Sequence, residues 1–139
     1  MHEQNRILCR ELSLLEFNRR VLAQAEDKNV PLLERLRFLC IVSSNLDEFF
    51  EVRMAWLKRE DKLHPRRKLD NGKMPSETIA DVTEAARSLI QHQYDLFNNV
   101  LQPELAQEGI FFYRRRNWTD TQKKWIEDYF DRELLPILT

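Results

Sequence analysis

A chain of 139 residues has the size of one ordinary domain, and its charge and cysteines exclude several classes of protein. The net charge is −1, so overall charge gives no reason to expect a nucleic acid or an anionic membrane as partner. Cys9 and Cys40 are far apart and form no CxxC or Cys/His spacing, so neither a disulfide framework nor a zinc site is indicated. Two glycines and five prolines leave little turn chemistry for a sheet of hairpins.

The opening residues, MHEQNRILCRELS, contain no apolar segment of signal-peptide length. No segment approaches the ~20 uninterrupted apolar residues that span a bilayer. We therefore expect a cytoplasmic protein without a transmembrane segment, and we leave peripheral association with a membrane open.

Residues 11–26 are expected to form the first helix. Ser13 is a favourable N-cap residue, and Glu16 three positions later completes a capping box. Apolar residues follow at helical spacing: Leu14, Phe17, Val21, Leu22 and Ala25. The connection to Pro31, which suits the first turn of the next helix, is short and predicts two antiparallel neighbours.

Residues 31–58 are expected to form one long helix that is too apolar to lie on a surface. Residues 38–42, FLCIV, have no polar break, so this turn should be buried on all sides. Ser43, Ser44 and Asn45 then place three small polar residues with poor helix propensity where burial should be greatest. A broken local rule inside an otherwise consistent element makes this the first candidate for a site.

The highly charged stretch after residue 58 is expected to be an exposed loop. It includes the turn signal Asp70-Asn71-Gly72 and the basic run 66–68, for which a solvated loop is favoured over phosphate binding. A third helix is expected over residues 76–107, with an apolar stripe at helical spacing. His92 lies off that stripe and is assigned no role.

Gly109 is expected to mark a boundary between two domains. Residues 110–113, IFFY, have strand character, and a second basic run follows at 114–116. Thr119 is the expected N-cap of a last helix over residues 120–135. A single strand needs a sheet, and no other segment supplies one, so we expect this tail to begin a second domain of a longer protein.

The predicted fold is all-α: an antiparallel bundle of three main helices with a trailing helix from the start of a second domain. The expected core residues are Phe17, Leu22, Leu36, Leu39, Val42, Leu46, Phe49, Leu89, Ile90 and Phe97.

Asn45 is the residue best suited to contact a ligand. Its side-chain amide offers one acceptor and two donors in a plane, which match the exocyclic amine and a ring nitrogen of adenine. Phe49 and Phe50, one turn on, can supply apolar or stacking surface for a base. From spacing alone, a bond to a main-chain carbonyl or to a polar group of another helix is the stronger interpretation. Asp47 and Glu48 point about 100° apart and cannot act together as an acid/base pair.

Two stretches resemble the N-terminal domain of the polyphosphate kinase family of the long, phosphohistidine-using type. They are ELSLLEFNRRVLAQAED and VPLLERLRFLCIVSSNLDEFFEVRMAWLK. The family opening usually reads E-L-S-W-L-x-F-N-x-R-V-L, and Leu14 stands here where Trp is usual. The family motif S-N-L-D-E-F-x-x-V-R is present from Ser44 to Arg53. The resemblance covers the whole chain and is most specific over its first ~60 residues, a much stronger signal than one short motif.

The resemblance implies an enzyme that reversibly transfers the γ-phosphate of ATP to inorganic polyphosphate, through a phosphorylated histidine and with Mg²⁺. In such enzymes the phosphohistidine and most phosphate-binding residues lie in C-terminal domains. We therefore expect no catalytic and no metal-binding residue in this chain, and no activity of the 139 residues alone. The N-terminal domain of the family covers the active-site tunnel and touches the adenine of ATP, and the residue that carries over to this contact is Asn45.

The resemblance also implies a domain organisation and a set of partners. Residues 1–107 should be the N-terminal helical domain, and residues 108–139 the beginning of the head domain, which is associated with dimer formation. The expected partners are ATP or ADP, inorganic polyphosphate, the remaining domains of the same enzyme and, at full length, a second copy. The alternative is a helical interaction module for domain docking or oligomerisation without direct nucleotide contact. A nucleic-acid binder is the weakest of the three, because both basic runs are short.

Overall fold

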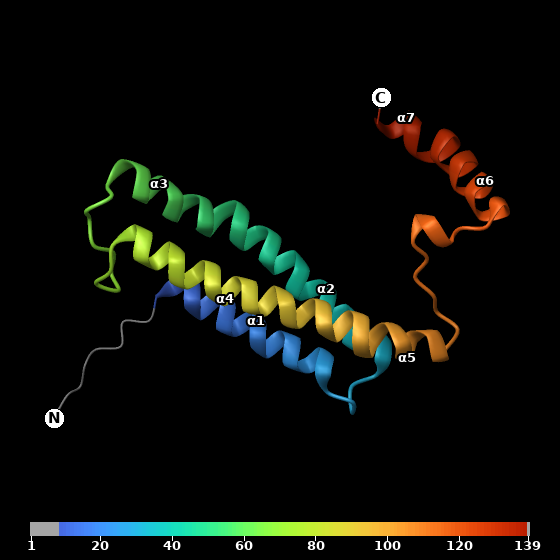
Figure 1. Cartoon of the computed structure of the whole chain (residues 1–139), viewed down its shortest axis with the longest axis horizontal. Coiled ribbons are helices and arrows are strands. Elements are labelled where there is room, and N and C mark those ends of the chain that lie inside the picture. The colour runs from blue at the N-terminus through green and yellow to red at the C-terminus, as the bar shows by residue number, and fades with distance from the viewer. Residues whose placement is uncertain (1–8, 139) are drawn as a thin grey trace.

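The computed structural model describes residues 9–138, in which all regular structure is helical (Figure 1). Three long helical segments lie side by side and run alternately in opposite directions, and a shorter helix follows at the C-terminal end (Figure 1). The predicted all-α antiparallel bundle with a trailing helix is thereby confirmed for the described residues.

Each long segment is continuous, and the second and third contain a π-helical stretch, labelled η. The segments are α1 (Arg10–Glu26); α2 (Leu32–Glu48), η1 (Phe49–Met54) and α3 (Ala55–Leu63); and α4 (Pro75–Leu96), η2 (Phe97–Leu101) and α5 (Gln102–Gln107). The second segment therefore continues one turn beyond the predicted end at residue 58. The third segment matches its prediction to within one residue.

The core lies where these segments meet. α1 packs against α2 and α4, α3 packs against α4, and η2 packs against α2. Six of the predicted core residues are buried: Leu22, Leu39, Val42, Leu46, Phe49 and Leu89. Three more are partly buried against the same cluster: Leu36, Ile90 and Phe97.

Phe17 is the exception, because its side chain is 51% exposed. The buried face of α1 is Glu11, Leu15, Asn18, Leu22 and Ala25. These positions alternate by four and three residues, as one face of a helix requires. Leu22 and Ala25 of the predicted stripe are buried, whereas Leu14 and Phe17 are each one position off the buried face, where Leu15 and Asn18 lie instead.

The start of α1 also differs from the prediction. Ser13 lies inside the helix and not at its N-cap, which is Cys9. The helix begins one residue before the expected range, its cap lies one turn before Ser13, and Glu11 in the first turn is buried and pairs with Arg53 of η1.

A partly buried ion pair connects the helical segments at the other end of the bundle. Arg35 is 3% exposed, its Nε donates to the carbonyl of Ala25 at 2.8 Å, and its Nη1 lies 2.7 Å from Glu104 Oε2. These contacts join the end of α1, the start of α2 and α5.

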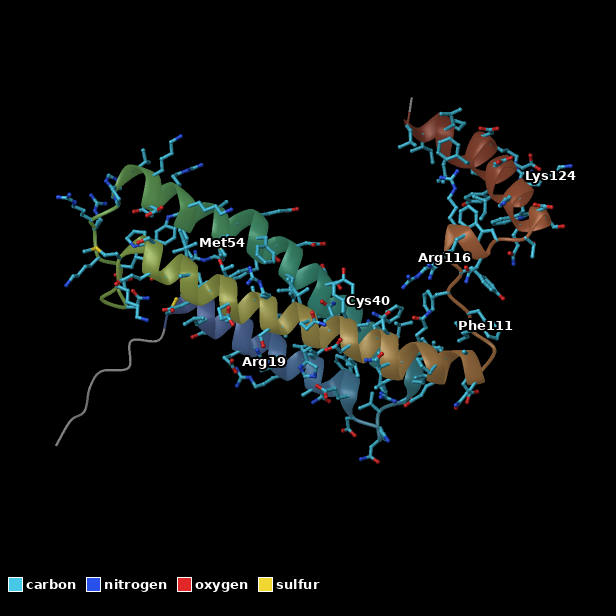
Figure 2. The ribbon with its side chains drawn as sticks, in the orientation of Figure 1. Arg19, Cys40, Met54, Phe111, Arg116 and Lys124 are labelled. Atoms are coloured by element: carbon cyan, nitrogen blue, oxygen red, sulfur yellow. The ribbon has the colours of Figure 1, made fainter. Side chains whose placement is uncertain are left out.

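The tail begins where a Schellman motif ends α5. Gly109 has φ +82°, and the N–H of Ile110 donates to the carbonyl of Leu105 at 2.9 Å. Residues 110–113 have no regular secondary structure, because the described residues offer no second strand to pair with them. Phe112 packs edge-to-face on Phe97 at a ring distance of 5.4 Å, while Phe111 remains 56% exposed on the connection to the last helix (Figure 2).

The trailing helix follows the prediction closely. It consists of α6 (Asp120–Tyr129), the π-helical stretch η4 (Phe130–Leu134) and α7 (Leu135–Leu138). A separate 3-10 turn, η3 (Arg115–Asn117), precedes it. Thr119 caps α6, and its side-chain oxygen accepts from the N–H of Gln122 in a capping box.

Candidate functional site

Asn45 lies at a cavity of about 250 Å³ between α1 and the second helical segment. A cavity this small is below the roughly 300–1,000 Å³ of a complete ligand site, so it suits one part of a larger ligand, such as a base. Its lining residues come from α1, α2 and η1, and they are Leu14, Phe17, Asn18, Asn45, Glu48, Phe49, Val52 and Arg53.

Asn45 is joined to α1 by two consecutive side-chain hydrogen bonds. Its Nδ2 donates to Oδ1 of Asn18 at 2.8 Å, and Nδ2 of Asn18 donates to the carbonyl of Leu14 at 3.0 Å. The polar break in α2 thus faces a polar group of another helix, as spacing alone had favoured. Only one N–H of the Asn45 amide is used, so its Oδ1 and its second N–H remain available to a ligand in the cavity.

The aromatic surface of the cavity differs from the one expected. Phe49 lines the cavity but is only 4% exposed, and Phe50 does not line it. Phe17 lines it with half of its side chain open to solvent, and Val52 is 56% exposed beside it. Phe17 is therefore the aromatic ring that a planar base can reach at this site.

Arg53 lies at the edge of the same cavity and is held by a buried acid. Its Nη2 is 2.5 Å from Glu11 Oε1, its guanidinium carbon lies 5.4 Å from the centre of the Trp56 ring, and its Nε is buried without a hydrogen-bond partner. Burial raises the pKa of Glu11, but hydrogen bonds from Arg53, from its own backbone N–H and from Cys9 together outweigh burial and lower that pKa below 4.5. The Glu11 carboxylate is therefore ionised and gives Arg53 a fixed position. Burial raises the pKa of the adjacent Cys9 thiol above 9.0, so Cys9 stays protonated near neutral pH.

A second cavity of about 610 Å³ is also lined by Arg53, together with Glu11 and Trp56. Arg67 and Lys68, from the first basic run, line it together with acidic residues such as Glu60 and Asp70. Because both signs of charge line this cavity, it presents no strong anion-binding surface.

A third cavity, of about 1180 Å³, lies in the tail and contains none of the residues predicted to contact ATP. It is formed between η3 and the last helix by apolar residues such as Trp118, Ile126 and Phe130. Arg115 and Arg116 of the second basic run border it, opposite acidic residues of the last helix. It therefore has mixed charge and lacks a polar group like Asn45 for reading a base.

The remaining residues considered in the sequence stay outside the Asn45 cavity. Asp47 is exposed and does not line it, although Glu48 does. Ser43 accepts a hydrogen bond from Gln93, and His92 pairs with Glu26 at 2.8 Å. Within residues 9–138 no group of three or more His, Cys, Asp or Glu side chains could hold a metal ion. No helix in that range combines the length and apolar character needed to cross a membrane.

Sequence reasoning missed two residues of this site, Phe17 and Asn18. Both belong to the stretch Leu14–Leu15–Glu16–Phe17–Asn18, in which the apolar residues were assigned to the core and Asn18 was passed over. The only available signal was that a stripe through Glu11, Leu15, Asn18 and Leu22 fits helical spacing as well as the one chosen.

Comparison with known proteins gives a consistent result. The family described as polyphosphate kinase N-terminal domain matches residues 7–113. The polyphosphate kinase of Neisseria meningitidis serogroup C is 94% identical over 139 residues, which are 100% of this chain and 20% of that protein. The polyphosphate kinase of Burkholderia multivorans is 50% identical over 133 residues, 96% of this chain and 19% of that protein.

One solved structure is also similar. The crystal structure of polyphosphate kinase from Porphyromonas gingivalis matches with a TM-score of 0.56 at 30% identity, over 91% of this chain and 17% of that one. The chain thus spans about a fifth of the length of the curated relatives it matches.

Proposed function

Because the chain belongs to the polyphosphate kinase N-terminal domain family, we propose that it forms the N-terminal part of a polyphosphate kinase and contacts the adenine of ATP through Asn45. The complete enzyme then transfers the γ-phosphate of ATP reversibly to inorganic polyphosphate, through a phosphohistidine and with Mg²⁺. As in the family that the chain resembles, Mg²⁺ and the transferred phosphate are assigned to other domains of that enzyme. The 139 residues contribute the nucleotide contact and a cover over the active-site tunnel.

The proposed domain boundary lies near residue 107. Residues 1–107 then form the N-terminal helical domain and residues 108–139 begin the head domain. The Schellman motif at Gly109 supports this division, because it ends the third helical segment and the following helix lies away from the bundle (Figure 1). Exposed side chains of that helix, such as Trp125 at 62%, are suited to packing against further chain.

The observation that carries the nucleotide contact is the position of Asn45 at the mouth of a base-sized cavity. Its amide has an unused acceptor and an unused donor, and Phe17 offers a half-exposed ring from the neighbouring helix. Hydrogen-bonding groups and a ring in one small cavity can read the edge of a base and cover its face. This combination requires α1 and α2 to be packed as they are.

The alternative, a docking surface without nucleotide contact, is favoured by the apolar residues around the same cavity. Leu14, Phe17 and Val52 are 37%, 51% and 56% exposed, which is suited to contact with another domain. The remaining domains of the same enzyme are the proposed occupant. A surface of this kind and a base contact can coexist, since the cavity occupies only part of it.

The test is Asn45→Ala in the complete enzyme that carries this chain. One neutral hydrogen bond contributes about 0.5–1.5 kcal/mol, which corresponds to a roughly 2- to 13-fold increase in the KM for ATP. The contact is remote from the transferred phosphate, so kcat should change little. The matched control is Asn99→Ala, an exposed asparagine of η2.

Two results would contradict the nucleotide contact. One is an Asn45→Ala enzyme whose KM for ATP equals that of the Asn99→Ala control. The other is a variant that loses kcat and keeps its KM. Calorimetry on the isolated 139 residues should detect ATP weakly or not at all, because the phosphates are held elsewhere; micromolar affinity would contradict that assignment.

A further inference from the structure

The orientation of the Asn45 amide is fixed by a chain of hydrogen bonds that starts at a main-chain carbonyl. The carbonyl of Leu14 can only accept, so the side chain of Asn18 must turn its Nδ2 towards it, at 3.0 Å. The Oδ1 of Asn18 is thereby directed at Asn45, which must donate its own Nδ2, at 2.8 Å. These two hydrogen bonds therefore fix the orientation of both side-chain amides.

Reversal of either amide would place two acceptors against each other. A reversed Asn18 would set its oxygen against the carbonyl of Leu14, and a reversed Asn45 would set its oxygen against that of Asn18. Asn18 is 4% exposed, so water cannot compensate for the lost hydrogen bond. The Asn45 amide therefore presents its Oδ1 acceptor and its remaining N–H donor to the cavity in one fixed arrangement.

We propose that Asn18 is a positioning residue which, through Asn45, makes this site select purine nucleotides with an amino group at position 6. The inference rests on the proposed contact between Asn45 and the base. Adenine has a donor at position 6 next to a ring acceptor, whereas guanine and hypoxanthine have an oxygen acceptor at that position. An amide that rotates freely matches either pattern. An amide fixed by Asn18 matches adenine and turns its oxygen towards the oxygen of the other two.

The first experiment uses the complete enzyme and three nucleotides that differ at the edge of the base. These are ATP, purine riboside triphosphate, which lacks the 6-amino group, and inosine triphosphate, which has an oxygen there. We expect kcat/KM to decrease in that order. A good bidentate contact discriminates by at least about fivefold, which is the expected minimum ratio between ATP and inosine triphosphate.

The second experiment releases Asn45 without removing it. Asn18→Leu replaces the buried amide by an apolar side chain of similar size, after which Asn45 can turn towards either base. The ratio of kcat/KM for ATP to that for inosine triphosphate should fall at least about threefold, with kcat for ATP retained. Asn98→Leu, the same substitution at an exposed asparagine of η2, is the matched control and should leave the ratio unchanged.

The outcomes separate this inference from the proposed function. If Asn45→Ala leaves the KM for ATP unchanged, the nucleotide contact is wrong and the inference falls with it. If Asn45→Ala raises that KM while Asn18→Leu keeps the wild-type ratio, only the role of Asn18 is wrong. Should Asn18→Leu fail to fold, the nucleotide series still decides. Equal use of ATP and inosine triphosphate by the wild type overturns the inference, because an Asn45 amide fixed by Asn18 must discriminate between them. A preference for ATP that Asn45→Ala abolishes supports a fixed Asn45 amide that reads the base.

Discussion

Substitution of Arg53 by methionine tests whether the Glu11–Arg53 pair stabilises the contact between α1 and η1. Methionine keeps much of the apolar length of the side chain and removes the guanidinium. The Glu11 side chain is 6% exposed and that of Arg53 is 25% exposed, so the variant leaves a nearly buried carboxylate without its partner. Charged hydrogen bonds contribute about 1.5–3 kcal/mol, and loss of one partner of a fully buried pair costs about 3–5 kcal/mol. Because Arg53 is partly exposed, we expect Arg53→Met to reduce the free energy of unfolding at pH 7 by about 2–3 kcal/mol.

The dependence of this cost on pH identifies the pair. Although burial raises the pKa of Glu11, the hydrogen bonds that it accepts outweigh burial, and its pKa in the folded protein is below the ordinary 4.5. The stabilisation is therefore fully present above pH 4.5 and is lost as the pH falls through the folded pKa. The difference in stability between wild type and Arg53→Met should be largest at pH 7 and smaller near pH 3.5.

Urea denaturation of the chain, followed by circular dichroism at several pH values, measures this difference directly. Arg59→Met is the control, because Arg59 is an exposed arginine of the same helical segment and its loss should cost less than about 0.5 kcal/mol. A cost of Arg53→Met that is equal to that of the control, or that stays constant from pH 7 to pH 3.5, would refute the assigned pair.

Two further predictions concern the packing of α1 and the partly buried pair of Arg35 and Glu104, and both are measured by urea denaturation of the same chain. Leu22→Ala should lower the free energy of unfolding by about 2–5 kcal/mol, because Leu22 is 0% exposed. Phe17→Ala should lower it by less than half as much, because the Phe17 side chain is 51% exposed. Equal losses for the two variants would mean that Phe17 belongs to the core. Arg35→Met should lower the free energy of unfolding by about 2–4 kcal/mol, because it removes the donor to the Ala25 carbonyl and the partner of Glu104. A loss below about 1 kcal/mol would show that these contacts contribute little to stability.

The helices could be predicted from the sequence because each has a long apolar stripe and a recognisable end. The third segment, from Pro75 to Gln107, and the cap at Thr119 are examples. The face of α1 could not be predicted, because a stripe counts apolar residues and so passes over a buried Asn18 that is satisfied by hydrogen bonds. Residues 110–113 have the composition of a strand, but strand formation depends on a partner that the described residues do not supply.

The candidate site was predictable only in part, for a similar reason. Asn45 attracted attention as a polar residue in an apolar helix, which is a local property of the sequence. Its partner Asn18 lies 27 residues away, and nothing in either segment specifies that the two amides meet. That contact depends on how α1 and α2 are rotated about their axes, which is decided by packing of the whole bundle.

The π-helical stretch η1 separates the second helical segment into two halves with different angular phase. The buried positions of α2 and the start of η1 are Arg35, Leu39, Val42, Leu46 and Phe49, spaced alternately by four and three residues. Continuation of this spacing would bury Arg53 and Trp56. The wider i→i+5 turn adds one residue, so Met54 and Leu57 are buried instead. The consequence is that Arg53 lies outside the core at the edge of both cavities, and Trp56 lines the one that Glu11 also lines. Deletion of one residue between Phe49 and Met54 would restore the four-residue spacing of a regular α-helix, so Met54 and Leu57 would stay buried without the wider turn.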